Sequence, residues 1–192
     1  MSINKKIIAV CLLVAASAFA SPKADPVSEV RRHDEELQAM LKRYSPSDKS
    51  QQDSLKQMIN GMFSFPELGK RALGKTWATL KKPQQDSFVA VFRRMVENSS
   101  IKRLESYRAD STKYSPVVGK GDKTVVTAKV FNKGKSSKVV YKLFPEGDTW
   151  KAWDLVLDEV SSLRSYRDQF STIVAKEGFD GLMKRLRKNA GA

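Results

Sequence analysis

The hydrophobic residues of this chain change their spacing twice, and this change limits the possible fold more than any other feature. Up to about residue 107 they recur every three or four positions, which is typical of helices that bury one face. Helical spacing returns at Leu163. Between these two parts lie four β-rich runs, 112–118, 124–131, 137–144 and 149–157. Their short, glycine-containing connections favour antiparallel hairpins. Helices, a β-meander and helices again predict an α+β fold.

The first helices are predicted from their end signals. Asp25 followed by Pro26 predicts the start of a helix that ends before Ser45. A second helix is expected over residues 51–61, because its apolar residues share one face.

The later helices have end signals of their own. Ser64 and Glu67 have the spacing of a capping box, which predicts a short helix that Gly74 terminates. The strongest helical pattern begins at Pro83 and is expected to reach as far as Tyr107. Near the other end of the chain, Gly178 predicts a stop between two C-terminal helices.

Alternation along the β-rich runs predicts which side chains face the core. Four lysines at alternating positions are expected to face solvent, at 129, 138, 142 and 151. The opposite face would then hold Val126, Ala128, Val130, Val139, Tyr141, Leu143, Trp150 and Val156. This assignment leaves Phe131, Val140, Phe144, Trp153 and Leu155 on the solvent side. Either both faces of the sheet are covered or one strand has a different register.

The N-terminal residues predict an exported protein. Lys5 and Lys6 precede an apolar run over residues 7–14, and small residues follow up to Ala20. This arrangement is typical of a cleavable signal peptide over residues 1–20, and the run is too short for a membrane-spanning helix. Cys11 is the only cysteine and lies in this leader. Residues 21–192 are therefore expected to form one domain that is held together by a hydrophobic core.

The net charge of the exported chain favours anionic partners. The full chain has 35 basic and 21 acidic residues, and loss of the two leader lysines leaves 33 basic residues and a net charge of +12. We expect no nucleic-acid partner, because the chain is exported and has no recognisable nucleic-acid-binding motif. Anionic lipid headgroups and acidic protein surfaces both fit the charge. A basic surface that is simply solvated is the alternative.

The residue types give little support to catalysis. Residues 21–192 have no cysteine, and the only histidine, His33, lies at the edge of a helical stripe, where we interpret it as a surface residue. We therefore predict no catalytic triad and no metal site built on histidine or cysteine. An enzyme that uses carboxylates or tyrosines is the alternative, and its candidate residues are Asp154, Asp158, Tyr107, Tyr114, Tyr141 and Tyr166. A carboxylate at a strand end is more often a satisfied hydrogen-bond acceptor, so we predict that the protein is not an enzyme.

Three parts of the chain resemble one family in order and spacing. The first is Phe63-Ser64-Phe65-Pro66-Glu67-Leu68, which continues through Ala72-Leu73-Gly74 to Trp77. The second is the helix from Pro83, with Gln85, Phe88, Phe92 and Arg93. The third comprises Trp150-Lys151-Ala152-Trp153-Asp154, Val160-Ser161, Tyr166-Arg167-Asp168-Gln169-Phe170 and Gly178-Phe179-Asp180-Gly181-Leu182. Together they resemble the MlaC family of periplasmic lipid-binding proteins, also called the toluene-tolerance auxiliary transport family.

The resemblance implies a fold and a function. The implied fold is a twisted four-stranded antiparallel sheet of cystatin-like or nuclear-transport-factor-like type, wrapped by helices around an apolar lipid pocket. The implied function is to carry phospholipid through the periplasm and so maintain outer-membrane lipid asymmetry. The implied partners are an inner-membrane ABC transporter with an MCE-domain ring and an outer-membrane complex of a lipoprotein with a porin. A hopanoid or sterol is the second ligand class. We expect a monomer without a cofactor that contacts membranes transiently.

The motif segments and the strand alternation together suggest site residues. The expected pocket residues are Phe92, Met95, Leu104, Val130, Tyr141, Val156, Val160, Tyr166 and Phe170. The expected contacts to headgroups or partner proteins are Arg164, Arg167, Lys184 and Arg185. Sequence periodicity does not distinguish a pocket from a filled core or a contact from a solvated face, so both alternatives stay open for each residue.

Overall fold

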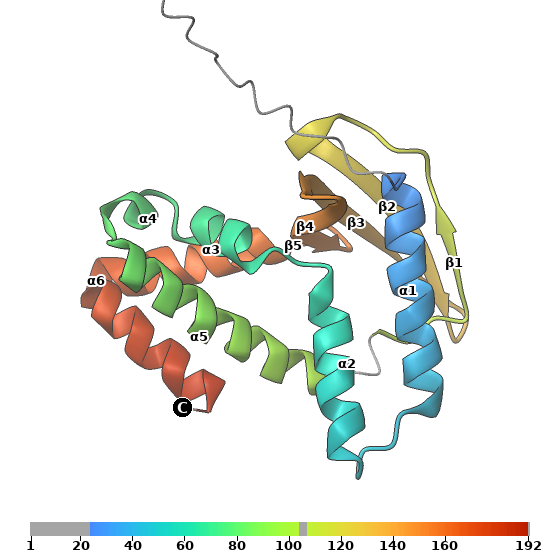
Figure 1. The fold of residues 1–192 in the computed structure, drawn as a ribbon, viewed down its shortest axis with the longest axis horizontal. Coiled ribbons are helices and arrows are strands. Elements are labelled where there is room, and N and C mark those ends of the chain that lie inside the picture. The colour runs from blue at the N-terminus through green and yellow to red at the C-terminus, as the bar shows by residue number, and fades with distance from the viewer. Residues whose placement is uncertain (1–23, 104–106, 192) are drawn as a thin grey trace, which may run out of the picture.

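The computed structural model describes residues 24–103 and 107–191, and the predicted signal peptide and Leu104 lie outside this part of the chain. It has an α+β fold, as predicted, in which one antiparallel sheet is combined with helices (Figure 1). The sheet has five strands in sequence order, so the predicted number of four is wrong. The strands are β1 (Ser111–Tyr114), β2 (Thr124–Asn132), β3 (Lys135–Glu146), β4 (Thr149–Leu157) and β5 (Val160–Ser161).

The additional strand, β5, is formed by a tight reversal after β4. Asp158 and Glu159 both have positive φ angles, of 45° and 70°, which turn the chain back on itself. Val160 then pairs with Leu157, and Ser161 pairs with Val156. A two-residue strand is too short to give an alternating hydrophobic pattern, and for this reason the sequence did not indicate it.

The first two helices begin at aspartate caps. Helix α1 (Pro26–Arg43) starts as predicted, and the Asp25 carboxylate accepts a hydrogen bond from the backbone N–H of Ser28 at 2.9 Å. Helix α2 (Lys49–Gly61) starts two residues before the predicted Gln51. Its cap is Asp48, which accepts a hydrogen bond from the Gln51 N–H at 3.1 Å.

The predicted capping box at Ser64 is wrong. Helix α3 (Phe65–Leu73) follows Ser64, but the Ser64 hydroxyl donates to the Glu146 carboxylate of β3 at 2.6 Å instead of accepting from the helix. The second member of the expected box, Glu67, forms an ion pair with Arg71 at 2.7 Å. Ser64 therefore connects the start of α3 to the sheet.

The remaining helices form one layer with α3. Helix α4 (Lys75–Thr79) is a single short turn, and α5 (Lys82–Ile101) ends before Tyr107, so the predicted extension of this helix is wrong. Helix α6 (Ser162–Ala190) has a break at Gly178, whose φ of 70° and ψ of −179° are not helical. The predicted stop at Gly178 is confirmed as this break. In the part of the chain that the structure describes, no helix combines the length and the apolar character needed to cross a membrane.

A β-bulge explains part of the conflict in the strand alternation, namely the position of Leu155, whereas Phe131, Val140 and Phe144 stay on the outer face. Lys142 of β3 pairs with Asp154, whereas the next residue, Leu143, pairs with Ala152, so Trp153 is an extra residue in β4. The extra residue reverses the facing of every later side chain in β4. Before the bulge Trp150 and Ala152 face the core of α1 and the sheet, and after it Leu155 does so. The predicted inward facing of Val156 is therefore wrong.

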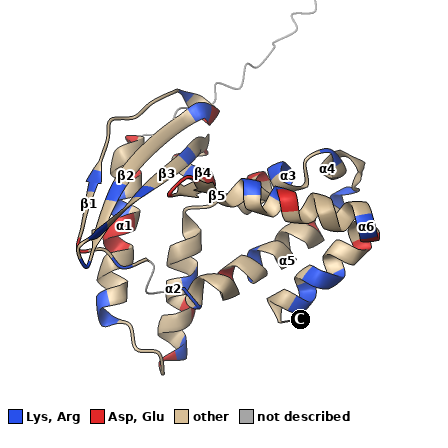
Figure 2. Cartoon of the chain, turned by 180° about the vertical axis from the view of Figure 1, so that it is seen from behind, with Lys and Arg blue, Asp and Glu red and all other residues tan. Residues whose placement is uncertain are grey.

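Three hydrophobic clusters make up the core. The largest joins α3, α5 and α6 around Phe88, Phe92 and Phe170. A second lies between α1 and the inner face of the sheet, and a third joins α1 to α2. In Figure 1, α3 to α6 lie on one side, the sheet and α1 lie on the other, and α2 stands between them. Basic residues are spread over both halves (Figure 2).

Candidate functional site

A cavity of about 460 Å³ lies where the three clusters meet. Its walls come from α1, α2, α5, the start of α6 and the inner face of strands β1 to β4. About half of the lining side chains are apolar or aromatic, and they include Leu37, Ile59, Met62, Phe63, Leu68, Val96, Val130, Val139, Leu155 and Leu157. A concave site of this size with such an apolar lining is typical of a binding pocket for a small, largely apolar ligand.

Basic side chains lie at the exposed edge of the cavity. Arg103 and Arg108 come from the segment after α5, and Lys135 is the first residue of β3. Arg108 donates to the Leu41 carbonyl at 3.1 Å, which fixes this segment against α1. Gln38 of α1 also holds the segment, because its amide donates to the Tyr107 carbonyl at 2.7 Å. The apolar cavity therefore has a cationic edge that suits a ligand with an anionic end.

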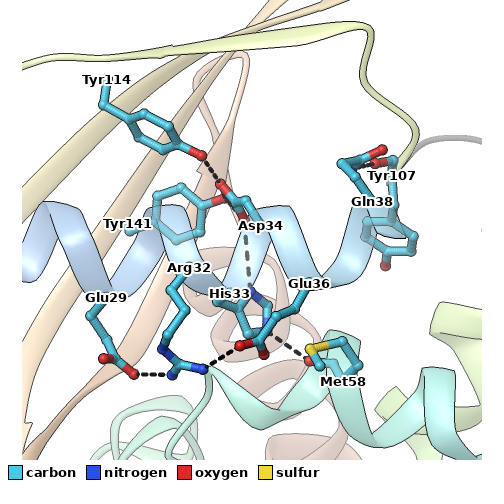
Figure 3. Close-up of polar contacts among 10 residues, drawn as sticks. All are labelled: Glu29, Arg32, His33, Asp34, Glu36, Gln38, Met58, Tyr107, Tyr114 and Tyr141. Carbon is cyan, nitrogen blue, oxygen red and sulfur yellow. Dashed lines mark hydrogen bonds and ion pairs between the residues drawn. The ribbon is translucent and has the colours of Figure 1, made fainter. Parts of the chain in front are cut away.

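A carboxylate with two tyrosine partners forms the polar part of the wall between α1 and the sheet. Tyr114 donates to Asp34 at 2.8 Å, and Tyr141 donates to it at 3.0 Å (Figure 3). Burial raises the pKa of both tyrosines, and the nearby Asp34 charge raises it further. Both phenols therefore stay neutral, and their hydrogen bonds hold α1 on the inner face of the sheet.

His33 also belongs to the cavity wall, so its interpretation as a surface residue is wrong. Its side chain is only 12% exposed, and its Nε2 donates to the Met58 carbonyl of α2 at 2.7 Å. Its Nδ1 lies 3.7 Å from the Asp34 carboxylate and has no hydrogen-bond partner among the residues that the structure describes. A signal for this position exists in the sequence, because His33 and Asp34 lie on the stripe between the buried Val30 and Leu37.

Three of the predicted pocket residues, Val130, Tyr141 and Tyr166, line the cavity. Phe92 and Phe170 lie instead in the helical core, with ring centroids 5.3 Å apart, and Met95 packs against this core. The Phe92 ring lies 4.9 Å from the Tyr166 ring and so supports the cavity wall from behind.

The other predicted pocket residues lie away from the cavity or cannot be placed. Val156 is on the outer face of the sheet, and Val160 of β5 is 64% exposed. Leu104 lies outside the described residues. Leu155 and Leu157 also line the cavity. The sequence did not identify them as lining residues, because the bulge at Trp153 reverses their facing.

The predicted basic contacts lie on α6 and do not line the cavity. Arg167 donates to the Arg71 carbonyl at 2.9 Å and 3.1 Å, and Arg185 forms an ion pair with Glu177. Arg164 and Lys184 are exposed. Their role as headgroup or partner contacts stays a prediction.

The first of the catalytic candidates, Asp154, is held by hydrogen bonds between elements of the fold. Asp154 is fully buried and accepts hydrogen bonds from Lys142 Nζ at 2.9 Å, Ser161 Oγ at 2.8 Å and the Leu163 N–H at 2.9 Å. It does not line the cavity. Because its three donors lie in β3, β5 and α6, Asp154 connects β4 to these elements. The same three hydrogen bonds leave its carboxylate little capacity for proton transfer to a ligand.

The other catalytic candidates have shifted pKa values. Burial raises the pKa of Tyr107 and Tyr166, and the nearby charge of Arg103 lowers it by less. The exposed Asp158 has a lowered pKa, because its carboxylate accepts the Lys138 N–H. Among residues 24–103 and 107–191, no group of three or more histidine, cysteine or acidic side chains could hold a metal ion.

An α+β domain with an apolar cavity and a cationic edge defines a protein of the ligand-binding class. The family model for the MlaC protein matches residues 31–188, and this chain therefore belongs to the MlaC family. Membership of this family points to a binding or transport protein rather than an enzyme.

A solved structure has the same fold. It is a phospholipid-binding protein from Ralstonia solanacearum, determined in complex with a phospholipid. The TM-score is 0.76 at 21% sequence identity, and the match covers 88% of this chain and 98% of that one.

Proposed function

We propose that this protein carries phospholipid through the periplasm, after export directed by the signal peptide at residues 1–20. The observation that carries the proposal is the apolar cavity between the sheet and helices α1, α2 and α5. The Ralstonia solanacearum protein, which has the same fold and was solved with a phospholipid, supports the choice of ligand. In this proposal acyl chains contact Val130, Tyr141 and Tyr166, and the headgroup lies toward Arg103, Arg108 and Lys135.

A carrier of this kind solves a free-energy problem. Each methylene group exposed to water costs about 0.8 kcal/mol, so about 30 methylenes in two acyl chains cost roughly 24 kcal/mol. An apolar cavity replaces the membrane interior at little cost, so lipid can exchange with a membrane in either direction. Net direction must then come from partners. We propose that these partners are the inner-membrane ABC transporter with its MCE-domain ring and the outer-membrane lipoprotein–porin complex. Residues 21–192 would form a single domain that acts as a monomer.

The proposal predicts that lipid co-purifies with the protein. Protein purified from an envelope extract without detergent is extracted with organic solvent, and the extract is analysed by mass spectrometry. An unrelated exported protein of similar charge, purified in the same way, serves as the blank. We expect diacyl phospholipid in the sample and not in the blank. A hopanoid or sterol would change the ligand class, and absence of any lipid would contradict the proposal.

A further inference from the structure

Three lysines stand directly opposite one another across the outer face of the sheet. Lys113 of β1 pairs with Lys129 of β2, and Lys129 pairs in turn with Lys138 of β3. All three are exposed. Basic residues lie along these strands in Figure 2. We call these three residues the lysine column.

The lysine column has a cost that the described part of the chain does not offset. Like charges directly opposite each other destabilise a sheet. None of the three forms an ion pair with another described residue, and Lys113 and Lys129 instead lie over the Phe131 ring at 5.7 Å and 5.4 Å. The nearby Asp110 and Asp158 carboxylates accept backbone N–H groups, of Lys133 and Lys138 respectively. Within residues 24–103 and 107–191 the lysine column therefore has no counter-charge, and an anionic surface would supply one.

The column lies next to the edge of the cavity. The turn between β2 and β3 adds the exposed Lys133, and the first residue of β3, Lys135, is exposed and lines the cavity. On the β4 side, Leu157 lines the cavity while 43% exposed. Val160, which pairs with Leu157, is 64% exposed. Cationic and aliphatic side chains therefore surround the same edge of the cavity.

We propose that the lysine column and this edge dock on the anionic surface of a lipid bilayer. The proposal deepens the lipid-carrier function and rests on it, because docking there brings the cavity next to the membrane. Protein–protein interfaces are depleted in lysine and enriched in arginine. Flexible lysine charges beside exposed aliphatic side chains suit mobile anionic headgroups, and each lysine near such a surface contributes about 1 kcal/mol.

The test compares two triple variants with the same change in net charge. K113Q/K129Q/K138Q removes the column, and K176Q/K184Q/K188Q removes three exposed lysines of α6. Binding is measured by co-sedimentation with phosphatidylcholine vesicles that contain phosphatidylglycerol, and pure phosphatidylcholine vesicles are the blank. Each lysine should contribute about fivefold to the affinity for the anionic vesicles. The column variant should therefore bind on the order of 100-fold more weakly than the wild type. The α6 variant should bind much more strongly than the column variant.

Two further measurements separate this proposal from unfolding and from failure of the carrier function. The single variant K129Q removes the middle charge, so its melting temperature should stay the same or rise while its vesicle binding weakens. The lipid content of the column variant, measured in the same samples, should equal that of the wild type. Wild-type protein that carries lipid but does not bind the anionic vesicles would overturn the docking proposal alone. Equal losses of vesicle binding in both triple variants would also overturn it. So would a column variant that keeps its vesicle binding and loses only its affinity for an acidic protein.

Discussion

Replacement of Val130 by tryptophan is expected to remove most of the lipid from the purified protein. Val130 lies on the inner face of β2 and lines the cavity, so an indole at this position occupies the space that an acyl chain needs. Overpacking an apolar site costs about 1–3 kcal/mol, so the affinity for lipid should fall on the order of tenfold to a hundredfold. The lipid-to-protein ratio, measured after organic extraction, gives the result.

Thr127→Trp is the matched control for this variant. Thr127 is in the same strand but on the outer face, because it lies between the buried Val126 and Ala128. This variant should keep its lipid. If Val130→Trp retained as much lipid as Thr127→Trp, the cavity next to β2 would not be the binding site.

Asp154→Asn is expected to destabilise the fold without changing lipid content. The substitution removes the charge that Lys142 and Ser161 contact, and the asparagine nitrogen would face the Lys142 ammonium group. Loss of one partner from a fully buried ion pair costs about 3–5 kcal/mol. The Lys142 side chain is 33% exposed and can turn toward water. We therefore expect a smaller loss, of about 2–3 kcal/mol in the free energy of unfolding, measured by urea denaturation.

The exposed Asp168 of α6 provides the control for this measurement. Asp168→Asn should change the free energy of unfolding by no more than about 0.5 kcal/mol. A stable Asp154→Asn protein that had lost the ability to convert a bound lipid would show that Asp154 is catalytic. That result would replace the carrier function with an enzymatic one.

Local signals in the sequence predicted the parts of the fold that depend on neighbouring residues. Asp25 and Pro26 mark the start of α1, and Gly178 marks the break in α6, because caps and left-handed positions restrict the residue type. The capping box at Ser64 failed, because a long-range partner, Glu146, competes for the same hydroxyl. The facing of β4 failed at Trp153, because a bulge depends on the neighbouring strand.

The cavity itself could be predicted only through the family resemblance. Phe92 and Tyr166 both follow the apolar spacing of their helices, yet Phe92 is filled core and Tyr166 lines the cavity. Periodicity identifies the buried face of a helix but not whether another side chain fills the space next to it. The polar residues of the cavity wall could not be predicted from periodicity either, because His33 and Asp34 form their hydrogen bonds only where α1 packs against α2 and the sheet.

The most direct test of the lipid-carrying cavity is the electron density in crystals of the protein purified with its native lipid. We expect continuous density for at least one acyl chain between the inner face of the sheet and α5, in contact with Val130, Leu155 and Val96. The headgroup should lie toward Arg103, Arg108 and Lys135. If mass spectrometry found lipid in the same crystals while the cavity held only water and the acyl density lay elsewhere, this cavity would not be the lipid-carrying site.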